Sequence, residues 1–206
     1  MNGTGGAGRE TILVVGGGIA GLTAAIEAAE AGAGVWLVEQ GPSLGGRVVN
    51  TSLYFPKLCP PACGLELNYQ RLRRNPAVRV ATLAGVAAVS GGPGAYRAQV
   101  RVKPRFVNER CTACGACVPA CPVERENPRN QGRDKTKAIY LPHDMAWPRR
   151  YVIDPAVCPG PSCGRCLPAC AAGAIDLGMG EERLDVEAGA IVIATGWRPY
   201  PAERLE

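Results

Sequence analysis

The sequence contains little histidine, few aromatic residues and no long apolar run. His143 is the only histidine, and only two phenylalanines occur among the 206 residues. A single histidine provides no evident acid–base apparatus, so His143 is interpreted as structural and no catalytic residue is assigned. Apolar residues make up 47% of the chain, largely as alanine and valine, while aromatic residues make up 5%. This composition predicts a globular protein and favours a closely wound α/β sheet over a β-sandwich.

Two further absences concern location. No segment approaches the ~20 apolar residues of a membrane span, and residues 1–10 (MNGTGGAGRE) lack the apolar core of an export signal. Work at a membrane is therefore expected only through a partner. The net charge is +5, with basic residues at 71–74, 101–110 and 149–150. These are interpreted as solvated surface, with a basic face for an acidic redox partner as the alternative. Nucleic-acid binding is not expected, because no reader motif accompanies the charges.

Cysteine, in contrast, is abundant and ordered. Eight of the ten cysteines form two runs, Cys111-x2-Cys114-x2-Cys117-x3-Cys121-Pro122 and Cys158-x4-Cys163-x2-Cys166-x3-Cys170. The first run has the bacterial ferredoxin spacing, in which the fourth cysteine of each run ligates the other cluster. The pattern predicts two [4Fe–4S] clusters. The predicted ligand sets are Cys111, Cys114, Cys117 and Cys170 for one cluster, and Cys158, Cys163, Cys166 and Cys121 for the other.

Two alternatives apply to these cysteines. Zinc also accepts four thiolates, although its sites usually pair two CxxC arms. A disulfide scaffold is disfavoured, because eight of the ten cysteines have ferredoxin-like spacing. Iron–sulfur assembly requires free thiols, so the protein is expected in a reducing cytoplasm. The second run departs from the ferredoxin pattern, since residues 159–162 lengthen its first spacer and no proline follows Cys170.

The N-terminal part predicts a nucleotide-binding βαβ unit. An apolar run at 11–15 leads into Gly16-x-Gly18-x-x-Gly21, a helical stretch follows over 22–31, and a second apolar run at 35–38 ends on Glu39. The three glycines permit a tight turn, close approach of a pyrophosphate and close packing of the helix on the sheet. Glu39 has the spacing of the acid that hydrogen-bonds a ribose hydroxyl.

FAD and NAD share this fingerprint, and the segment after Glu39 separates them. Gly45-Gly46-Arg47 resembles the flavoprotein continuation, which implies that these residues lie against the FAD pyrophosphate. An ordinary loop is the alternative for the glycine pair. Near the other end, an apolar strand at 189–194 leads into Thr195-Gly196, which is typical of FAD-dependent disulfide-reductase-like domains.

Between these landmarks, three prolines predict a rigid, non-helical loop over 52–64. It carries Cys59 and Cys63, interpreted either as a redox dithiol or extra cluster ligands, or as two unrelated thiols. A basic helix is expected over 66–75, a third parallel strand near 78–80, and a hairpin up to 102.

The cysteine-rich segment is expected to interrupt the flavin fold, because an apolar strand returns after it. We predict a flavin-binding part at 1–104, an inserted α+β two-cluster ferredoxin domain at 105–178, and a continuation of the flavin-binding part at 179–206. Within the insert, strands are expected near Ile139 and Tyr151, and a closing strand at 174–177. The predicted fold class is α/β, with a Rossmann-like FAD-binding domain of the disulfide-reductase type.

A flavin fold interrupted by a two-cluster ferredoxin resembles the A subunits of heterodisulfide reductase and of the quinone-interacting membrane-bound oxidoreductase. The stretches that carry the resemblance are VVGGGIAGLTAAIEAAEAG, LVEQGPSLGGRV, YFPKLCPPACGLELN, KPRFVNERCTACGACVPACPV and IVIATGWRPY. The segment at 55–66 is nearer to the quinone-interacting branch.

The resemblance implies an electron-transfer subunit in a complex with other iron–sulfur and flavin subunits, with FAD and two [4Fe–4S] clusters as cofactors. The subunit is expected to resemble the A subunit of the quinone-interacting branch. The alternatives are a heterodisulfide reductase A-like subunit, with or without electron bifurcation, and a truncated, non-catalytic cluster-binding or interaction module. Family members continue well beyond Gly196, so the flavin domain is expected to be incomplete at its C-terminal end and to retain FAD weakly on its own.

Overall fold

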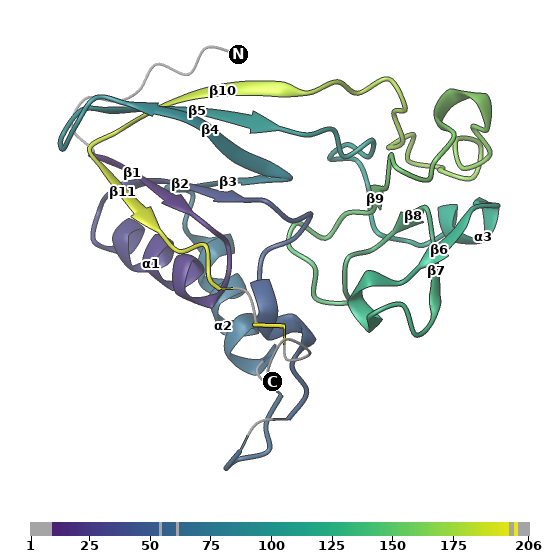
Figure 1. Cartoon of the computed structure of the whole chain (residues 1–206), viewed down its shortest axis with the longest axis horizontal. Helices are drawn as coiled ribbons and strands as arrows, with labels where there is room; N and C mark the ends of the chain where they lie inside the picture. The colour runs from purple at the N-terminus through teal and green to yellow at the C-terminus, as the bar shows by residue number, and fades with distance from the viewer. Residues whose placement is uncertain (1–9, 54, 61, 198–199, 202–206) are drawn as a thin grey trace.

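The computed structural model describes residues 10–53, 55–60, 62–197 and 200–201. Residues 1–9 lie outside this range, as do two positions of the loop expected over 52–64. Figure 1 shows two parts, one with long strands and two helices, and one with short strands and the cysteine-rich loops. Within the described part of the chain, no helix is long and apolar enough to cross a membrane.

The first part is built on a four-stranded parallel sheet with the order β11-β1-β2-β3. Its strands are β1 (Thr11–Val15), β2 (Gly34–Glu39), β3 (Val78–Thr82) and β11 (Ala190–Ile193). The expected strands at 11–15, 35–38 and near 78 are therefore confirmed, and the returning strand at the end of the chain pairs with β1.

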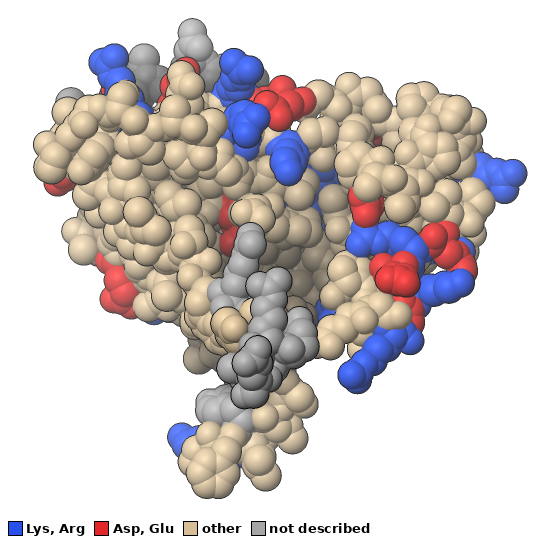
Figure 2. Space-filling model, in the orientation of Figure 1, with Lys and Arg blue, Asp and Glu red and all other residues tan. Residues whose placement is uncertain are grey.

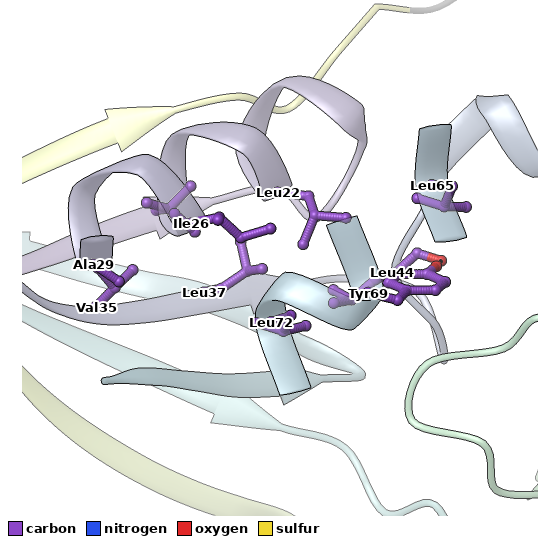
Figure 3. Packing of buried hydrophobic residues seen from close by; sticks show 11 residues of the cluster. Leu22, Ile26, Ala29, Val35, Leu37, Leu44, Leu65, Tyr69 and Leu72 are labelled. Atoms are coloured by element: carbon purple, nitrogen blue, oxygen red, sulfur yellow. Dashed lines mark hydrogen bonds between the residues drawn. The ribbon is translucent and has the colours of Figure 1, made fainter. Parts of the chain in front are cut away.

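Two helices cover one face of this sheet, namely α1 (Ile19–Glu30) and α2 (Ala62–Arg74). The apolar face of α1 contributes Leu22, Ala25, Ile26 and Ala29 to a buried cluster with residues of β1, β2 and α2. In Figure 3, Leu22 and Ile26 point from α1 toward Leu37 of β2. The helix expected over 66–75 runs from Ala62 to Arg74, so the prediction of a non-helical loop over 52–64 is wrong for residues 62–64. The helix begins after the last proline of that segment, where the chain is again free to form helical hydrogen bonds.

A three-stranded antiparallel sheet covers the opposite face. It has the order β10-β5-β4, with β4 at Ala84–Ser90, β5 at Tyr96–Val102 and β10 at Glu182–Ala188. The expected hairpin is β4–β5, with a bulge at 86–88. Leu13 and Val38 pack between the sheets with Val100 and Val186. This layer is held by residues from both sides of the cysteine-rich segment, because β5 precedes that segment and β10 follows it.

The cysteine-rich part contains little regular structure. Its elements are α3 (Cys117–Ala120), β6 (Glu124–Glu126), β7 (Lys135–Lys137), β8 (Ile139–Tyr140) and β9 (Val152–Ile153), with short 3₁₀ turns η2 (Pro128–Asn130) and η3 (Gly160–Ser162). A third such turn, η1 (Gly46–Asn50), lies in the first part. The strand expected at 174–177 is wrong: only a single bridge joins Ile175 to Val107, because turns flank it on both sides.

The path of the chain agrees with an insertion. It leaves the first part after β5, forms the cysteine-rich part, and returns through β10 and β11 (Figure 1). The α/β fold with an inserted ferredoxin-like module is confirmed, while the domain boundaries at 104/105 and 178/179 stay a prediction.

Candidate functional site

The first candidate site is the glycine turn between β1 and α1. Gly18 caps the start of α1, and no side chain hydrogen-bonds the amides of the first helical turn. Those amides and the positive end of the helix dipole favour a phosphate group. The second glycine pair lies beside the turn, since the Gly45 amide donates to the Gly17 carbonyl at 2.8 Å and Gly45 bridges Gly18. Both expected glycine segments are thus at one place.

Two glycines of this turn have no room for a side chain. A Cβ atom on Gly21 would lie 1.8 Å from the Gly16 carbonyl oxygen. At Gly16, where φ is +108°, it would lie 2.3 Å from the Ala194 oxygen. In contrast, the nearest atom to a Cβ on Gly18 is 4.0 Å away. The turn is therefore closed toward the sheet and open at Gly18, an arrangement that fits a dinucleotide pyrophosphate.

Glu39 lies at the end of β2, as expected for the ribose-binding acid. Its carboxylate accepts hydrogen bonds from the Gly17 amide and the Gly41 amide, both at 2.6 Å. Glu39 therefore holds the glycine turn against the loop that follows β2. Its contact with a ribose stays a prediction.

The residues after β11 complete this edge of the sheet. The Ala194 amide donates to the Val15 carbonyl at 2.8 Å, which places Thr195 and Gly196 beside the glycine turn. The Arg47 guanidinium lies 4.4 Å from the centre of the exposed Trp197 ring. The expected FAD-binding residues are thus gathered from four segments at the carboxyl edge of the parallel strands.

The second candidate site is a pair of cavities in the cysteine-rich part. One contains four cysteines, and we call it the first cysteine cavity. Its cysteines are Cys111, Cys114, Cys117 and Cys170. The second cysteine cavity contains Cys121, Cys158, Cys163 and Cys166. Each cavity therefore combines three cysteines of one run with the fourth cysteine of the other.

Local folding explains this exchange. α3 runs from Cys117 to Ala120, so Cys117 and Cys121 lie at its two ends, and each faces a different cavity. Backbone amides point at two sulfurs: Ala174 donates to Cys170 at 3.3 Å and Gly160 donates to Cys158 at 3.4 Å. Such bonds stabilise the thiolate form that iron requires. None of the described residues form a group of three or more ligands around a single metal ion.

The cysteine thiols that line the cavities differ from one another in pKa. Burial raises the pKa of Cys117 to about 11 and also raises the pKa of Cys166. The pKa of Cys114 is lowered, first by a hydrogen bond from the Ala116 amide and then by one from the Thr112 hydroxyl. Buried thiols with a raised pKa need a bound cation to stay ionised, which fits residues that hold a positively charged cluster core.

The structure also shows a junction between the two parts that the sequence did not indicate. The Trp147 amide donates to Ser43 Oγ at 2.8 Å, and the Leu44 amide donates to the Trp147 carbonyl at 2.8 Å. The Trp147 ring stacks on Tyr69 with centroids 6.2 Å apart, and the Tyr69 hydroxyl donates to the Leu44 carbonyl. Leu44 directly precedes Gly45. The hydrogen bond between Leu44 and Trp147 therefore attaches the cysteine-rich part next to the glycine pair Gly45-Gly46.

Arg105 is the second element of this junction and corrects an expectation. It belongs to the basic group interpreted as solvated surface, yet it is 7% exposed. Its guanidinium donates to the Pro42 carbonyl, to Thr82 Oγ1 at 2.8 Å and to the Arg150 carbonyl at 3.3 Å. Burial, assisted by the charge of Arg150, lowers its pKa to about 10. Elsewhere, Figure 2 shows lysines and arginines spread over both parts of the molecule.

His143 belongs to the same junction. It is buried, and its Nε2 atom lies 3.0 Å from Ser43 Oγ. Burial lowers the pKa of His143 below its ordinary value. As the pH falls through about 6.5, the unfolded chain therefore binds a proton before the folded chain does. The free energy of unfolding therefore decreases as the pH falls, because the folded chain keeps this ring neutral.

We expect His143→Gln to make unfolding less dependent on pH. Between about pH 7.5 and about pH 5.5, the free energy of unfolding of the unmodified chain decreases more than that of the variant, by at most about 1.4 kcal/mol per pH unit. Denaturant unfolding of both proteins at each pH measures the difference. Parallel decreases in the two proteins would contradict a buried neutral histidine.

Cys59 and Cys63 lie apart from these sites. Cys63 is exposed in the first turn of α2, and Cys59 is half-buried in the preceding loop. The described residues that line the two cysteine cavities do not include either one. A role as a redox dithiol or as extra cluster ligands stays a prediction.

Comparisons with known proteins agree with both sites. A family model described as FAD dependent oxidoreductase matches residues 11–72, and one described as 4Fe-4S binding domain matches residues 104–124. The A subunit of the Ferredoxin/F(420)H(2)-dependent CoB-CoM heterodisulfide reductase of Methanosarcina acetivorans is 39% identical over 195 residues, which are 94% of this chain and 24% of that protein. Nearly all of this chain is therefore similar to about a quarter of a heterodisulfide reductase A subunit.

The chain is also similar to other proteins. The A subunit of the H(2):CoB-CoM heterodisulfide,ferredoxin reductase of Methanothermobacter marburgensis is 36% identical over 94% of this chain and 29% of its own length. The chain thus spans about a quarter of the curated relatives that it matches. Among solved structures, Lactococcus lactis thioredoxin reductase has a TM-score of 0.37 with 20% identity, covering 44% of this chain and 30% of that one.

Proposed function

We propose that this chain passes electrons between FAD at the glycine turn and two [4Fe–4S] clusters, one in each cysteine cavity. The observation that supports this most is the exchange of fourth cysteines between two separate cavities. Zinc sites built from two CxxC arms have no need of that exchange, whereas two-cluster ferredoxins use it.

Each cofactor supplies chemistry that the side chains lack: flavin exchanges two electrons, and iron–sulfur clusters exchange one at a time. The residues of the chain bind, orient and insulate. The amides near Gly18 would hold the pyrophosphate, Glu39 fixes the turn, and the burial of Cys117 and Cys166 would keep water away from these two cluster ligands. The junction of Ser43, Trp147 and Arg105 holds the two sites at a fixed separation.

The assembly that we propose is a heterodisulfide reductase-like complex, in which other iron–sulfur or flavin subunits donate and accept the electrons. The similarity over 94% of the chain to the A subunits of heterodisulfide reductases supports this branch. The nearness of 55–66 to the quinone-interacting branch stays a prediction, with contact to a membrane only through a partner. We place the protein in the cytoplasm, since cluster assembly requires reduced thiols.

Electron transfer within the chain can be observed after rapid photochemical reduction of bound FAD under anaerobic conditions. We expect flavin absorbance to recover while cluster absorbance bleaches, at a rate that does not change with protein concentration. A Cys114→Ser, Cys163→Ser double variant is the control, in which reduced flavin persists. Persistence of reduced flavin in the unmodified chain, or a chain that holds iron and binds no flavin when FAD is supplied in excess, would instead favour a non-catalytic cluster-binding module.

A further inference from the structure

The two cysteine cavities differ in the side chains that surround the sulfurs. Among the described residues lining the second cavity, only the cysteines carry polar side-chain atoms; the others are proline, valine, alanine, isoleucine, leucine and glycine. The first cavity is lined by two hydroxyl groups as well, those of Thr112 and Tyr151. Each cavity has four cysteines, but only the first has polar side-chain groups other than cysteine in its lining.

The positions of both hydroxyls are set by the fold. A Cβ atom built on Gly115 would lie 3.3 Å from the Tyr151 hydroxyl oxygen, so this oxygen lies over the turn between Cys114 and Cys117. Thr112 lines the same cavity two residues before Cys114. Cys114 is also exposed, whereas each cysteine of the second cavity is buried or half-buried. The first cavity therefore has two side-chain hydroxyl groups in its lining and one solvent-exposed cysteine.

Reduction makes these differences matter. A [4Fe–4S] cluster gains one negative charge when it accepts one electron, and donors or water near its sulfurs stabilise the more negative state. The second cavity has the Gly160 amide as a donor to Cys158 but no side-chain hydroxyl group, so its otherwise apolar lining compensates the added charge less. The reduction potential is therefore expected to be higher where hydroxyl groups face the sulfurs.

We propose that Tyr151, assisted by Thr112, raises the reduction potential of the cluster in the first cysteine cavity above that of the cluster in the second. The first cluster is then reduced before the second, each accepting one electron, so that two electrons from one reduced flavin fill both. This inference rests on the proposed function, and it assigns the order in which the two clusters fill. Tyr151 acts as a tuning residue and not as a ligand.

Tyr151 also lies where the first cavity meets the flavin-binding part. Its carbonyl accepts a hydrogen bond from Arg105 at 3.5 Å, and the same guanidinium contacts Pro42 and Thr82 of the flavin-binding part. Tyr151, which directly precedes β9, thus contributes its hydroxyl group to the first cavity and its carbonyl group to the junction with the flavin-binding part. The cluster that fills first is the one attached to the flavin side through this stretch.

The test is a redox titration of the anaerobically reconstituted 206-residue chain, with each cluster followed by electron paramagnetic resonance. Cys114→Ser identifies the signal of the first cavity. We expect Tyr151→Phe to lower the higher of the two potentials and to leave the lower one unchanged. Loss of one hydrogen bond changes the reduction equilibrium about three- to tenfold, where tenfold is about 59 mV for one electron. If the Tyr151→Phe variant does not retain its clusters, Thr112→Val is used instead and is expected to lower the same potential.

Tyr140→Phe is the matched control, because Tyr140 lies in β8, beneath the Arg125 guanidinium and outside the linings of both cavities. It is expected to move neither potential. An unchanged higher potential in Tyr151→Phe, or a change confined to the lower one, would overturn the inference while leaving the proposed function intact. An unmodified chain with fewer than about eight irons, four for each cluster, would overturn the proposed function itself.

Discussion

Cys170→Ala will empty the cysteine site that is distant from it in the sequence. Cys170 closes the second run, yet it lines the first cysteine cavity with Cys111, Cys114 and Cys117. Its removal leaves that cavity with three thiolates, while the second cavity keeps all four. We expect iron to fall from about eight to about four atoms per chain, with the remaining cluster in the second cavity.

Thiol labelling identifies which cavity is emptied. In Cys170→Ala, an alkylating reagent followed by mass spectrometry should modify Cys111, Cys114 and Cys117, while the cysteines of the second run stay protected. Cys121→Ala is the mirror control and should expose Cys158, Cys163 and Cys166 instead. Labelling of the second run in Cys170→Ala would show that each run closes its own site, and the assignment across runs would be wrong.

Gly21→Ala will remove FAD and destabilise the first part of the molecule. The added methyl group lies 1.8 Å from the Gly16 carbonyl oxygen and 3.1 Å from the Ala194 side chain, so α1 must move away from β1 and β11. Overpacking of this kind costs about 1–3 kcal/mol, and the movement displaces the amides that face the pyrophosphate. Flavin occupancy should therefore fall strongly, while iron content changes little.

Gly64→Ala is a matched control for that substitution. Gly64 is an exposed residue of α2 with no atom within 4 Å of its Cβ position, and alanine is favoured over glycine in helices by about 1 kcal/mol. Flavin fluorescence after denaturation and unfolding by denaturant measure occupancy and stability in both variants. Equal flavin occupancy in Gly21→Ala and Gly64→Ala would contradict the proposed cofactor position.

The regular part of the fold could be predicted because its signals are local. Gly16, Gly18 and Gly21 follow an apolar run, and Glu39 ends the next one, so β1, α1 and β2 follow from adjacent residues. Strand pairing between distant segments was harder to predict. The sequence predicts a hairpin up to 102 but does not indicate that β10 pairs with β5. The strand expected at 174–177 reduces to one bridge at Ile175, since turns on both sides leave no room for a ladder.

The candidate sites follow the same division. The ferredoxin spacing predicts which cysteines share a site, including the distant Cys121 and Cys170, because that spacing reflects a known three-dimensional arrangement. The junction was not predictable, since Ser43 and Trp147 are 104 residues apart and meet only through folding. Arg105 opens the cysteine-rich segment, but its carbonyl partners, Pro42, Arg150 and Tyr151, are brought to it only by folding.

Metal and sulfide analysis of anaerobically prepared chain tests the central claim most directly. The account predicts about eight irons and about eight inorganic sulfides for each chain, four of each for every cluster, with all eight cavity cysteines protected from alkylation until the iron is removed. Zinc in place of iron, or disulfides among these cysteines without inorganic sulfide, would contradict it.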